Sequence, residues 1–294
     1  MSLSALYDVP APAKVNLFLH VVGRRADGFH LLQSVFVLID WADTLHFERR
    51  ADAALTRHDL GAALPADDLT LKAARALHNA SGTSLGADIS IDKRLPWAAG
   101  LGGGSSNAAT TLLALNRLWG LNWPRQRLLA LAATLGADVP FFVGGHNAFV
   151  EGIGEHLTPL VVPRLWLALV KPAAGLATPE VFSHPALVRD TPAVILAGFL
   201  ADASQPRFWA GDWGRNDLQP PAEDRCPEVA QAAEWLRRHF GNSRMTGSGS
   251  AVFARCGMDD RPAATWPAKD PLPPGWVGRM CRSLDQHPLA DWSG

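Results

Sequence analysis

A glycine-rich segment at residues 96–106 has the composition that most directly suggests chemistry. It lies between a predicted strand and a predicted helix. Backbone amides in such a loop, together with the positive end of the helix that follows, form a site for an anion such as a phosphate group. Glycines let the main chain approach that anion closely. The candidate phosphate-binding residues are Pro96, Trp97, Ala98, Ala99, Gly100, Leu101, Gly102, Gly103, Gly104, Ser105 and Ser106.

Other glycine-rich motifs fit this segment less well. A Walker A loop requires lysine directly after glycine, and no lysine of the chain follows a glycine. A dinucleotide fingerprint counted from Gly100 and Gly102 would need glycine where Ser105 stands. Residues 95–116 contain no lysine or arginine, so positive charge must come from elsewhere, including a bound Mg²⁺. A flexible turn without a ligand stays open as the alternative.

Lys14 and Asp138 have the residue types of a catalytic pair, although nothing in their spacing brings them together. Lys14 lies on the polar face of a predicted strand, and Asp138 lies in a short polar gap after Gly136. A lysine beside an aspartate lowers the pKa of the carboxyl group and neutralises charge on a transferring phosphoryl group. The aspartate could accept a proton from a hydroxyl group or only orient that hydroxyl. Alternatively, Asp138 could cap a helix and Lys14 could be an ordinary exposed lysine.

Hydrophobic periodicity predicts mixed helices and strands with an antiparallel sheet. Alternation at residues 13–22 predicts a strand with Lys14, Asn16, Phe18 and His20 on its polar face. Residues 31–47 predict two strands joined by a turn near Trp41. Further strands are expected at residues 87–91, 165–170 and 251–254, helices at 69–81, 108–119, 124–135 and 227–240, and loops in the proline-rich tail at 258–274.

The size of the chain favours two domains with a cleft between them. A chain of 294 residues exceeds a comfortable single core, and the apolar segment after residue 160 starts a new unit. We therefore expect an N-terminal domain at residues 1–160 and a C-terminal domain at residues 161–294.

Charge and cysteine content exclude several classes of protein. The formal net charge is -1, and no block of five like charges occurs, so no nucleic-acid partner is expected. The first 12 residues lack the features of an export signal, and the long uncharged stretch at 95–116 contains too many glycines and serines for a membrane span. Three widely spaced cysteines do not form a disulfide framework. We expect a cytoplasmic protein without a membrane partner.

Three motifs, in order along the chain, resemble those of the GHMP kinase superfamily, named for galactose, homoserine, mevalonate and phosphomevalonate. Residues 93–107 resemble its ATP-binding motif, residues 12–17 its first motif, and residues 245–250 its third. The resemblance implies a two-domain α+β GHMP kinase fold, with an ATP-binding N-terminal domain, a ferredoxin-like C-terminal domain and the active site between them. It also implies ATP and Mg²⁺ as cofactors, without indicating which protein groups bind the metal.

Within that superfamily the chain resembles the kinases of diphosphocytidyl-linked alcohols. Residues 23–34, 136–142 and 215–218 carry this resemblance, which extends from about residue 12 to residue 254. It implies phosphorylation of the 2-hydroxyl of a methylerythritol unit in the non-mevalonate route to isoprenoid precursors. Asp138 is then the catalytic aspartate, with Lys14 beside it. The implied partners are ATP and one small-molecule substrate, and the expected state is a monomer or a weak homodimer.

The same resemblance assigns substrate-binding residues. Phe29 and Phe182 would stack on a cytosine base while His30 forms hydrogen bonds with it. The family usually has tyrosine at Phe29, and it has methionine and glycines where this chain has Trp97 and the two alanines after it. Either phenylalanine could instead belong to the core, and Trp97 could contact adenine or serve as an apolar lid. The implied substrate-binding residues are Asn16, Phe29, His30, Thr178 and Phe182.

Two other functions remain possible from the sequence. One is a kinase of the same class that phosphorylates homoserine or mevalonate, which the residues at 23–34 disfavour. The other is a sensor that binds nucleotide and ligand without catalysis, because a fold does not determine a function. Lys14 and Asp138 disfavour the sensor.

Overall fold

The computed structural model describes residues 3–205, 208–209, 213–258 and 260–292. Its first half forms a six-stranded sheet with the order β3-β4-β2-β5-β6, to which β1 adds by pairing with β2. All pairs are antiparallel except β3 with β4. The expected antiparallel sheet is thus present. The strands are β1 (Ala5–Arg24), β2 (His30–Arg50), β3 (Leu55–Asp59), β4 (Gly86–Asp92), β5 (Ala148–Gly152) and β6 (His156–Pro159).

The predicted break in β2 is wrong, because residues 30–50 form one continuous strand. Pro12 pairs with Ala42 and Ala13 pairs with Ile39, so two extra residues of β2 bulge out at the expected turn. Asp40, in the bulge, accepts a hydrogen bond from the backbone of Arg282 at 2.8 Å. The polar and aromatic residues that suggest a turn therefore connect β2 to the second sheet.

The predicted alternation of β1 is also interrupted by a bulge. Asn16 pairs with Phe36 and Leu19 pairs with Ser34, which leaves one extra residue in β1. Phe18 consequently packs in the core, 4.6 Å from the Trp213 ring, and Leu19 lies on the pocket side with Asn16. The predicted membership of Phe18 in the polar face is wrong for this reason.

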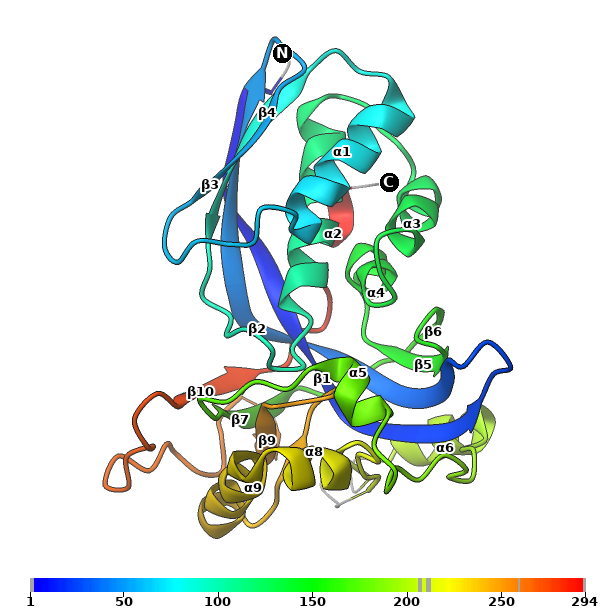
Figure 1. Ribbon diagram of the computed structural model, residues 1–294, viewed down its shortest axis with the longest axis vertical. Helices are drawn as coiled ribbons and strands as arrows, with labels where there is room; N and C mark the ends of the chain where they lie inside the picture. Colours follow the sequence, from blue (N-terminus) through cyan, green and yellow to red (C-terminus); the bar gives the residue numbers. More distant parts are fainter. Residues whose placement is uncertain (1–2, 206–207, 210–212, 259, 293–294) are drawn as a thin grey trace.

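Helices cover one face of the first sheet (Figure 1). The predicted cap of α1 (Leu69–Ser81) is confirmed, because Asp68 accepts a hydrogen bond from Leu71 N and Gly82 ends the helix at φ 66°. The helix α2 (Gly103–Leu118) packs between α1 and the strands, and Pro124 precedes α3 (Arg125–Ala133) as predicted. A short helix, α4 (Val139–Gly144), follows.

The second half of the chain forms a four-stranded antiparallel sheet with the order β10-β7-β9-β8. Helices lie below it in Figure 1, and residues 260–276 contain no helix or strand, as predicted for the proline-rich tail. The elements are β7 (Leu165–Lys171), α5 (Thr178–Phe182), α6 (Leu196–Ala203), α8 (Gln219–Arg225), α9 (Pro227–Phe240), β8 (Arg244–Met245), β9 (Val252–Met258), β10 (Val277–Arg282) and the 3₁₀ helix η1 (Ala290–Trp292).

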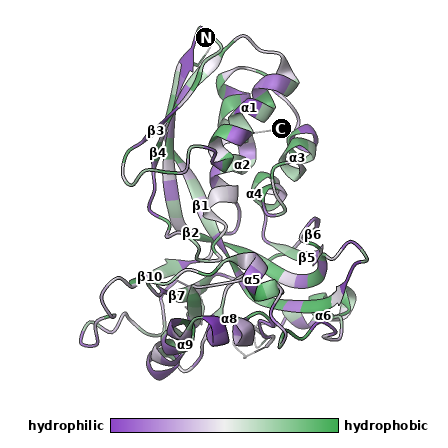
Figure 2. Cartoon of the chain, in the orientation of Figure 1, coloured by the Kyte–Doolittle hydropathy of each residue, from purple (hydrophilic) through white to green (hydrophobic). Residues whose placement is uncertain are grey.

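Figure 2 shows apolar residues along the strands of both sheets and in the helices packed on them. One buried cluster lies between the first sheet and its helices, one joins β1 and β2 to β7 and β9, and one lies between the second sheet and α9. The chain end returns to the first half, where Leu284 N donates to Leu38 O at 2.8 Å and Leu289 is buried. The domain boundary at residue 160 stays a prediction. No helix within the described residues is long and apolar enough to cross a membrane.

Candidate active site

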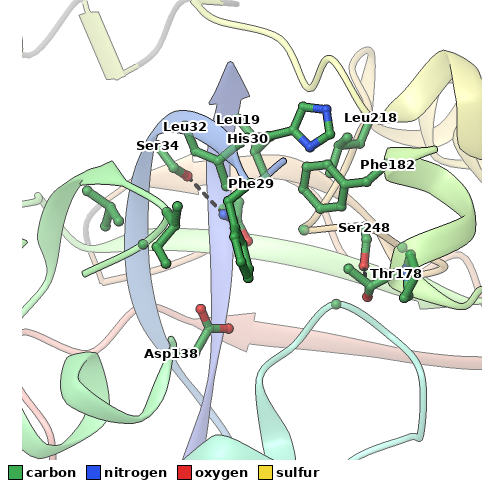
Figure 3. A pocket seen from close by; sticks show the side chains of 18 of the residues that line it. Leu19, Phe29, His30, Leu32, Ser34, Asp138, Thr178, Phe182, Leu218 and Ser248 are labelled. Carbon is green, nitrogen blue, oxygen red and sulfur yellow. Dashed lines mark hydrogen bonds between the residues drawn. The ribbon is translucent and has the colours of Figure 1, made fainter. Parts of the chain in front are cut away.

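A pocket of about 790 Å³ is lined by residues from both halves of the chain (Figure 3). Strands β1 and β2, the turn between them, the glycine loop and the start of α4 line it from the first half. Helix α5, the coil after it and residues 247–249 line it from the second half. Candidate site residues that lie far apart in the sequence therefore line the same cavity.

The glycine loop has a conformation that requires glycine at two positions. Gly100 and Gly102 have φ values of 71° and 69°, and both line the pocket. A Cβ atom on Gly100 would lie 2.2 Å from Thr246 O. A Cβ atom on Gly102 would lie 2.9 Å from the Phe142 ring and 3.2 Å from Lys14 Cγ. The loop is therefore packed tightly against Lys14 and the third motif.

Direct hydrogen bonds connect the three motifs. Asn16 N donates to Thr246 Oγ1 at 2.8 Å, and Ser250 N donates to Ala98 O at 3.0 Å. Lys14 N donates to Leu101 O at 3.0 Å. The first and third motifs thus fix the position of the glycine loop from two sides.

The predicted catalytic pair meets in the pocket. Lys14 Nζ lies 3.6 Å from Asp138 Oδ2, and the lysine is only 4% exposed. A buried ammonium needs polar partners, and Asn16 Oδ1 accepts from it at 2.6 Å while the Phe36 ring lies 4.5 Å away. Asp138 occupies the cap position of α4, but its side chain makes no capping hydrogen bond. Its carboxylate faces the cavity instead (Figure 3).

Three other predicted residues form side-chain hydrogen bonds with other groups of the protein. Asn16 accepts from Lys14 and donates to Ser34 Oγ at 2.9 Å, so its side chain orients the lysine. Ser106 is fully buried and donates to Pro12 O at 2.6 Å. Thr178 Oγ1 lies 2.7 Å from Ser248 Oγ and lines the pocket. Ala99 and Leu101 are buried, so this loop presents mainly its backbone to a ligand.

Sequence reasoning missed Lys93, a cation close to the glycine loop. Its Nζ atom would lie 3.0 Å from a Cβ atom on Gly103, and it forms a buried ion pair with Asp43. Its ammonium also lies 5.6 Å from the centre of the Trp97 ring. Lys93 lies two residues before the stretch at 95–116 that contains no lysine or arginine. This short separation in the sequence could have identified it as a cation near the loop. Because Asp43 neutralises this ammonium, the backbone amides remain the main groups that the loop offers to an anion.

The predicted base-binding residues lie together at the other end of the pocket. The rings of His30 and Phe182 stack with centroids 5.1 Å apart, and Phe29 extends into the cavity at 58% exposure (Figure 3). Its exposure shows that Phe29 is not a core residue. Desolvation, followed by the charges of Arg189 and Arg24, lowers the pKa of His30 below its ordinary value of 6.5.

Arg189 lines the same end of the pocket and was not predicted. Its Nε atom donates to His30 Nε2 at 3.2 Å, and its terminal nitrogens donate to carbonyl oxygens of residues 182, 184 and 187. No motif in the sequence marks it, because it lies in a coil 159 residues from its histidine partner.

Comparisons with known proteins agree with this geometry. Residues 68–146 match the model of the GHMP kinases N terminal domain, and residues 203–265 match that of the GHMP kinases C terminal domain. The kinase fold and the site thus define a GHMP kinase. A homoserine kinase structure from Cytophaga hutchinsonii has a TM-score of 0.64 at 18% identity, covers 86% of this chain and 85% of its own, and indicates the shared fold alone.

Two further relatives show which family of GHMP kinases the chain belongs to. The 4-diphosphocytidyl-2-C-methyl-D-erythritol kinase of Methylibium petroleiphilum is 63% identical over 294 residues, which is 100% of both chains. A crystal structure of 4-(cytidine 5'-diphospho)-2C-methyl-D-erythritol kinase has a TM-score of 0.69 at 35% identity and covers 83% of this chain and 88% of its own. The chain belongs to the family of 4-diphosphocytidyl-2-C-methyl-D-erythritol kinases.

Proposed function

We propose that this protein transfers the terminal phosphoryl group of ATP to the 2-hydroxyl of 4-diphosphocytidyl-2-C-methyl-D-erythritol. This reaction belongs to the methylerythritol phosphate route to isoprenoid precursors. Full-length relatives that carry the name of this kinase support the assignment. The strongest structural support is the position of the Lys14–Asp138 pair. It lies between the glycine loop and the aromatic end of one pocket.

The pair suits in-line phosphoryl transfer. The Asp138 carboxylate takes the proton of the substrate hydroxyl as its oxygen bonds to the phosphorus atom, and the bond to the leaving oxygen of ADP breaks. The Lys14 ammonium, 3.6 Å from that carboxylate, stabilises negative charge on the transferring group. Backbone amides of the glycine loop bind the remaining phosphates.

The aromatic end suits a cytosine base. The exposed face of Phe29 and the ring of Phe182 offer surfaces for stacking, and His30 provides a polar group beside them. Stacking a base on an aromatic side chain contributes about 1–3 kcal/mol per base.

The pocket can accept a magnesium ion if the phosphates of ATP provide most of the ligands of that ion. The described residues contain no cluster of three histidines, cysteines or carboxylates, and Asp138 is the carboxylate among the residues that line the pocket. Mg²⁺ in kinases is held by substrate phosphates and one or two carboxylates, so Asp138 and the phosphates would hold it. The ion would neutralise charge on the phosphates of ATP.

The competing substrates are homoserine and mevalonate, whose kinases share the fold. Neither contains a base, so neither explains an exposed phenylalanine and a histidine at one end of the pocket. A sensor without catalysis does not explain a buried lysine beside a pocket-facing aspartate.

Steady-state turnover with each candidate substrate tests the proposal. We expect kcat/KM for 4-diphosphocytidyl-2-C-methyl-D-erythritol to exceed the values for homoserine and mevalonate by about 10³ or more, because a site built for a polar base rejects compounds that lack it. Cytidine diphosphate should compete with that substrate and not with ATP. Efficient phosphorylation of homoserine or mevalonate, with cytidine diphosphate inert, would contradict the proposal.

Cellular location and assembly stay predictions. The three cysteines are free and buried, and burial raises the pKa of Cys256 to about 12, so these thiols suit a reducing cytoplasm. We expect a monomer or a weak homodimer, which sedimentation analysis would measure.

A further inference from the structure

Arg189 is held in the pocket by an unusually complete set of hydrogen bonds. Nε donates to His30 Nε2 at 3.2 Å, and Nη1 donates to Leu187 O at 3.0 Å. Nη2 donates to both Phe182 O at 3.1 Å and His184 O at 2.9 Å. Four of the five N–H donors of a guanidinium are thereby used. The group has little freedom to turn away from the histidine.

This arrangement determines which nitrogen of His30 carries the proton. A guanidinium remains protonated and only donates hydrogen bonds, so Nε2 of the imidazole must accept. A neutral imidazole that accepts at Nε2 carries its proton on Nδ1. The described residues offer Nδ1 no hydrogen-bond partner, and His30 lines the cavity, where its ring lies over that of Phe182 (Figure 3).

The charges around His30 also favour the neutral form of its imidazole. Arg189 and Arg24 are the charged groups that face the imidazole, and both disfavour a second positive charge on it. Together with desolvation, the largest cause, they keep the pKa of His30 below 6.5. At neutral pH the ring is therefore uncharged, with a single N–H group available to a ligand.

We propose that Arg189 is a positioning residue that keeps the His30 proton on Nδ1, so that the pocket selects cytosine over uracil. The inference rests on the proposed function and specifies the base preference of the same site. Cytosine presents an unprotonated N3 that accepts a hydrogen bond from Nδ1–H. Uracil carries a proton on N3, so it would place a donor against a donor and leave both groups unpaired.

Arg189 also connects the two parts that recognise the base. The same guanidinium that donates to the imidazole also donates to the carbonyl oxygen of Phe182, the last residue of α5. Its removal thus affects both stacking and hydrogen bonding, and a loss of affinity alone would not identify its role. The test needs measurements that depend on the position of one proton.

The first measurement is the tautomer of His30 in ligand-free protein labelled with ¹⁵N-histidine. Long-range ¹H–¹⁵N correlation spectra distinguish Nδ1–H from Nε2–H, and a His30→Gln variant assigns the signals. We expect Nδ1–H in the wild type, and in Arg189→Met a shift toward Nε2–H together with a raised His30 pKa. A wild-type His30 protonated at Nε2 would overturn the proposal, and this result does not depend on any substrate.

The second measurement compares cytidine diphosphate and uridine diphosphate as competitive inhibitors against the diphosphocytidyl substrate. We expect Arg189→Met to lower the preference for cytidine diphosphate by about tenfold, since an unpaired polar group no longer penalises uracil. The KM for ATP should stay the same. Arg189→Lys keeps a cation that only donates, so it should retain more of the preference.

Arg237→Met is the control, because Arg237 pairs with Glu234 within α9 and does not line the pocket. It should keep the wild-type base preference. An unchanged preference in Arg189→Met, with only a higher KM, would assign Arg189 a merely structural role and overturn the inference. If cytidine diphosphate did not bind the wild type at all, the proposed function would fail, whereas the tautomer measurement would still decide the role of Arg189.

Discussion

At the phosphate end of the pocket two loops are locked together by their main chains, whereas at the base end one aromatic residue stands on an exposed turn. Gly100 touches the backbone of Thr246 so closely that a methyl group has no room, and Lys14 beside them is 4% exposed. Phe29, by contrast, is 58% exposed, and Arg189 belongs to a coil without regular structure.

The difference separates catalysis from recognition. Groups that stabilise a transition state need fixed positions, which buried strands and close backbone packing provide. Stacking on a base tolerates more variation, since it depends on area and not on one atom. The base end therefore accommodates phenylalanine at residue 29, whereas the phosphate end has little tolerance for change. Four substitutions test this contrast.

The largest effect is expected at Asp138, the proposed catalytic carboxylate. Asp138→Asn should lower kcat by about 10²–10⁴, because the amide cannot take the proton of the substrate hydroxyl. ATP affinity, measured by calorimetry without Mg²⁺, should stay near the wild-type value, since the glycine loop is unchanged. A variant that keeps most of its turnover would exclude an essential role as a base and leave Asp138 as an orienting group.

Gly100→Ala should be the most destabilising change at the phosphate end. Its left-handed backbone and the contact with Thr246 O predict a loss of about 2–4 kcal/mol in the free energy of unfolding. Gly104→Ala is the matched control, because Gly104 lies within α2 and its Cβ would find its nearest neighbour at 3.7 Å. Urea unfolding of both variants measures the difference, and equal stabilities would contradict the tight packing of this loop.

At the base end, Phe182→Ala should raise the KM for the diphosphocytidyl substrate by about 5–100-fold, from the loss of one stacking surface. The KM for ATP should change little, and the protein should remain folded because Phe182 is only partly buried. Equal increases in both KM values would indicate a general disturbance of the pocket and would remove Phe182 from the base site.

The smallest effect is expected for Phe29→Tyr. The added hydroxyl group would extend from an exposed ring, so the KM for the diphosphocytidyl substrate should change by about twofold or less. Phe29→Ala serves as the comparison and should raise KM as Phe182→Ala does. A large gain in affinity from the tyrosine would show that residue 29 contributes a hydrogen bond and not only a stacking surface.

Several features of this protein follow from its sequence alone. The motifs at residues 12–17, 93–107 and 245–250 indicated the superfamily, and the comparisons confirm it. The ends of α1 follow from Asp68 and Gly82, whose effects on the backbone are local. Lys14 and Asp138 were predicted as a pair, and they lie 3.6 Å apart. Local chemistry and recognisable motifs suffice for such features.

Other features depend on contacts between distant segments. Alternation along β1 placed Phe18 on the wrong face, since a bulge depends on how β1 pairs with β2. The turn expected near Trp41 is a bulge because β10 lies beside it and supplies a hydrogen bond to Asp40.

The same reason explains the two missed cations. The side chain of Lys93 lies close to Gly103 and pairs with Asp43, and no pattern in the sequence indicates these two contacts. Arg189 reaches His30 across 159 residues of sequence, from a coil that no periodic pattern describes. Composition and periodicity report the local preferences of the backbone. Which nitrogen of one histidine carries a proton depends on which donor the folded chain places beside it.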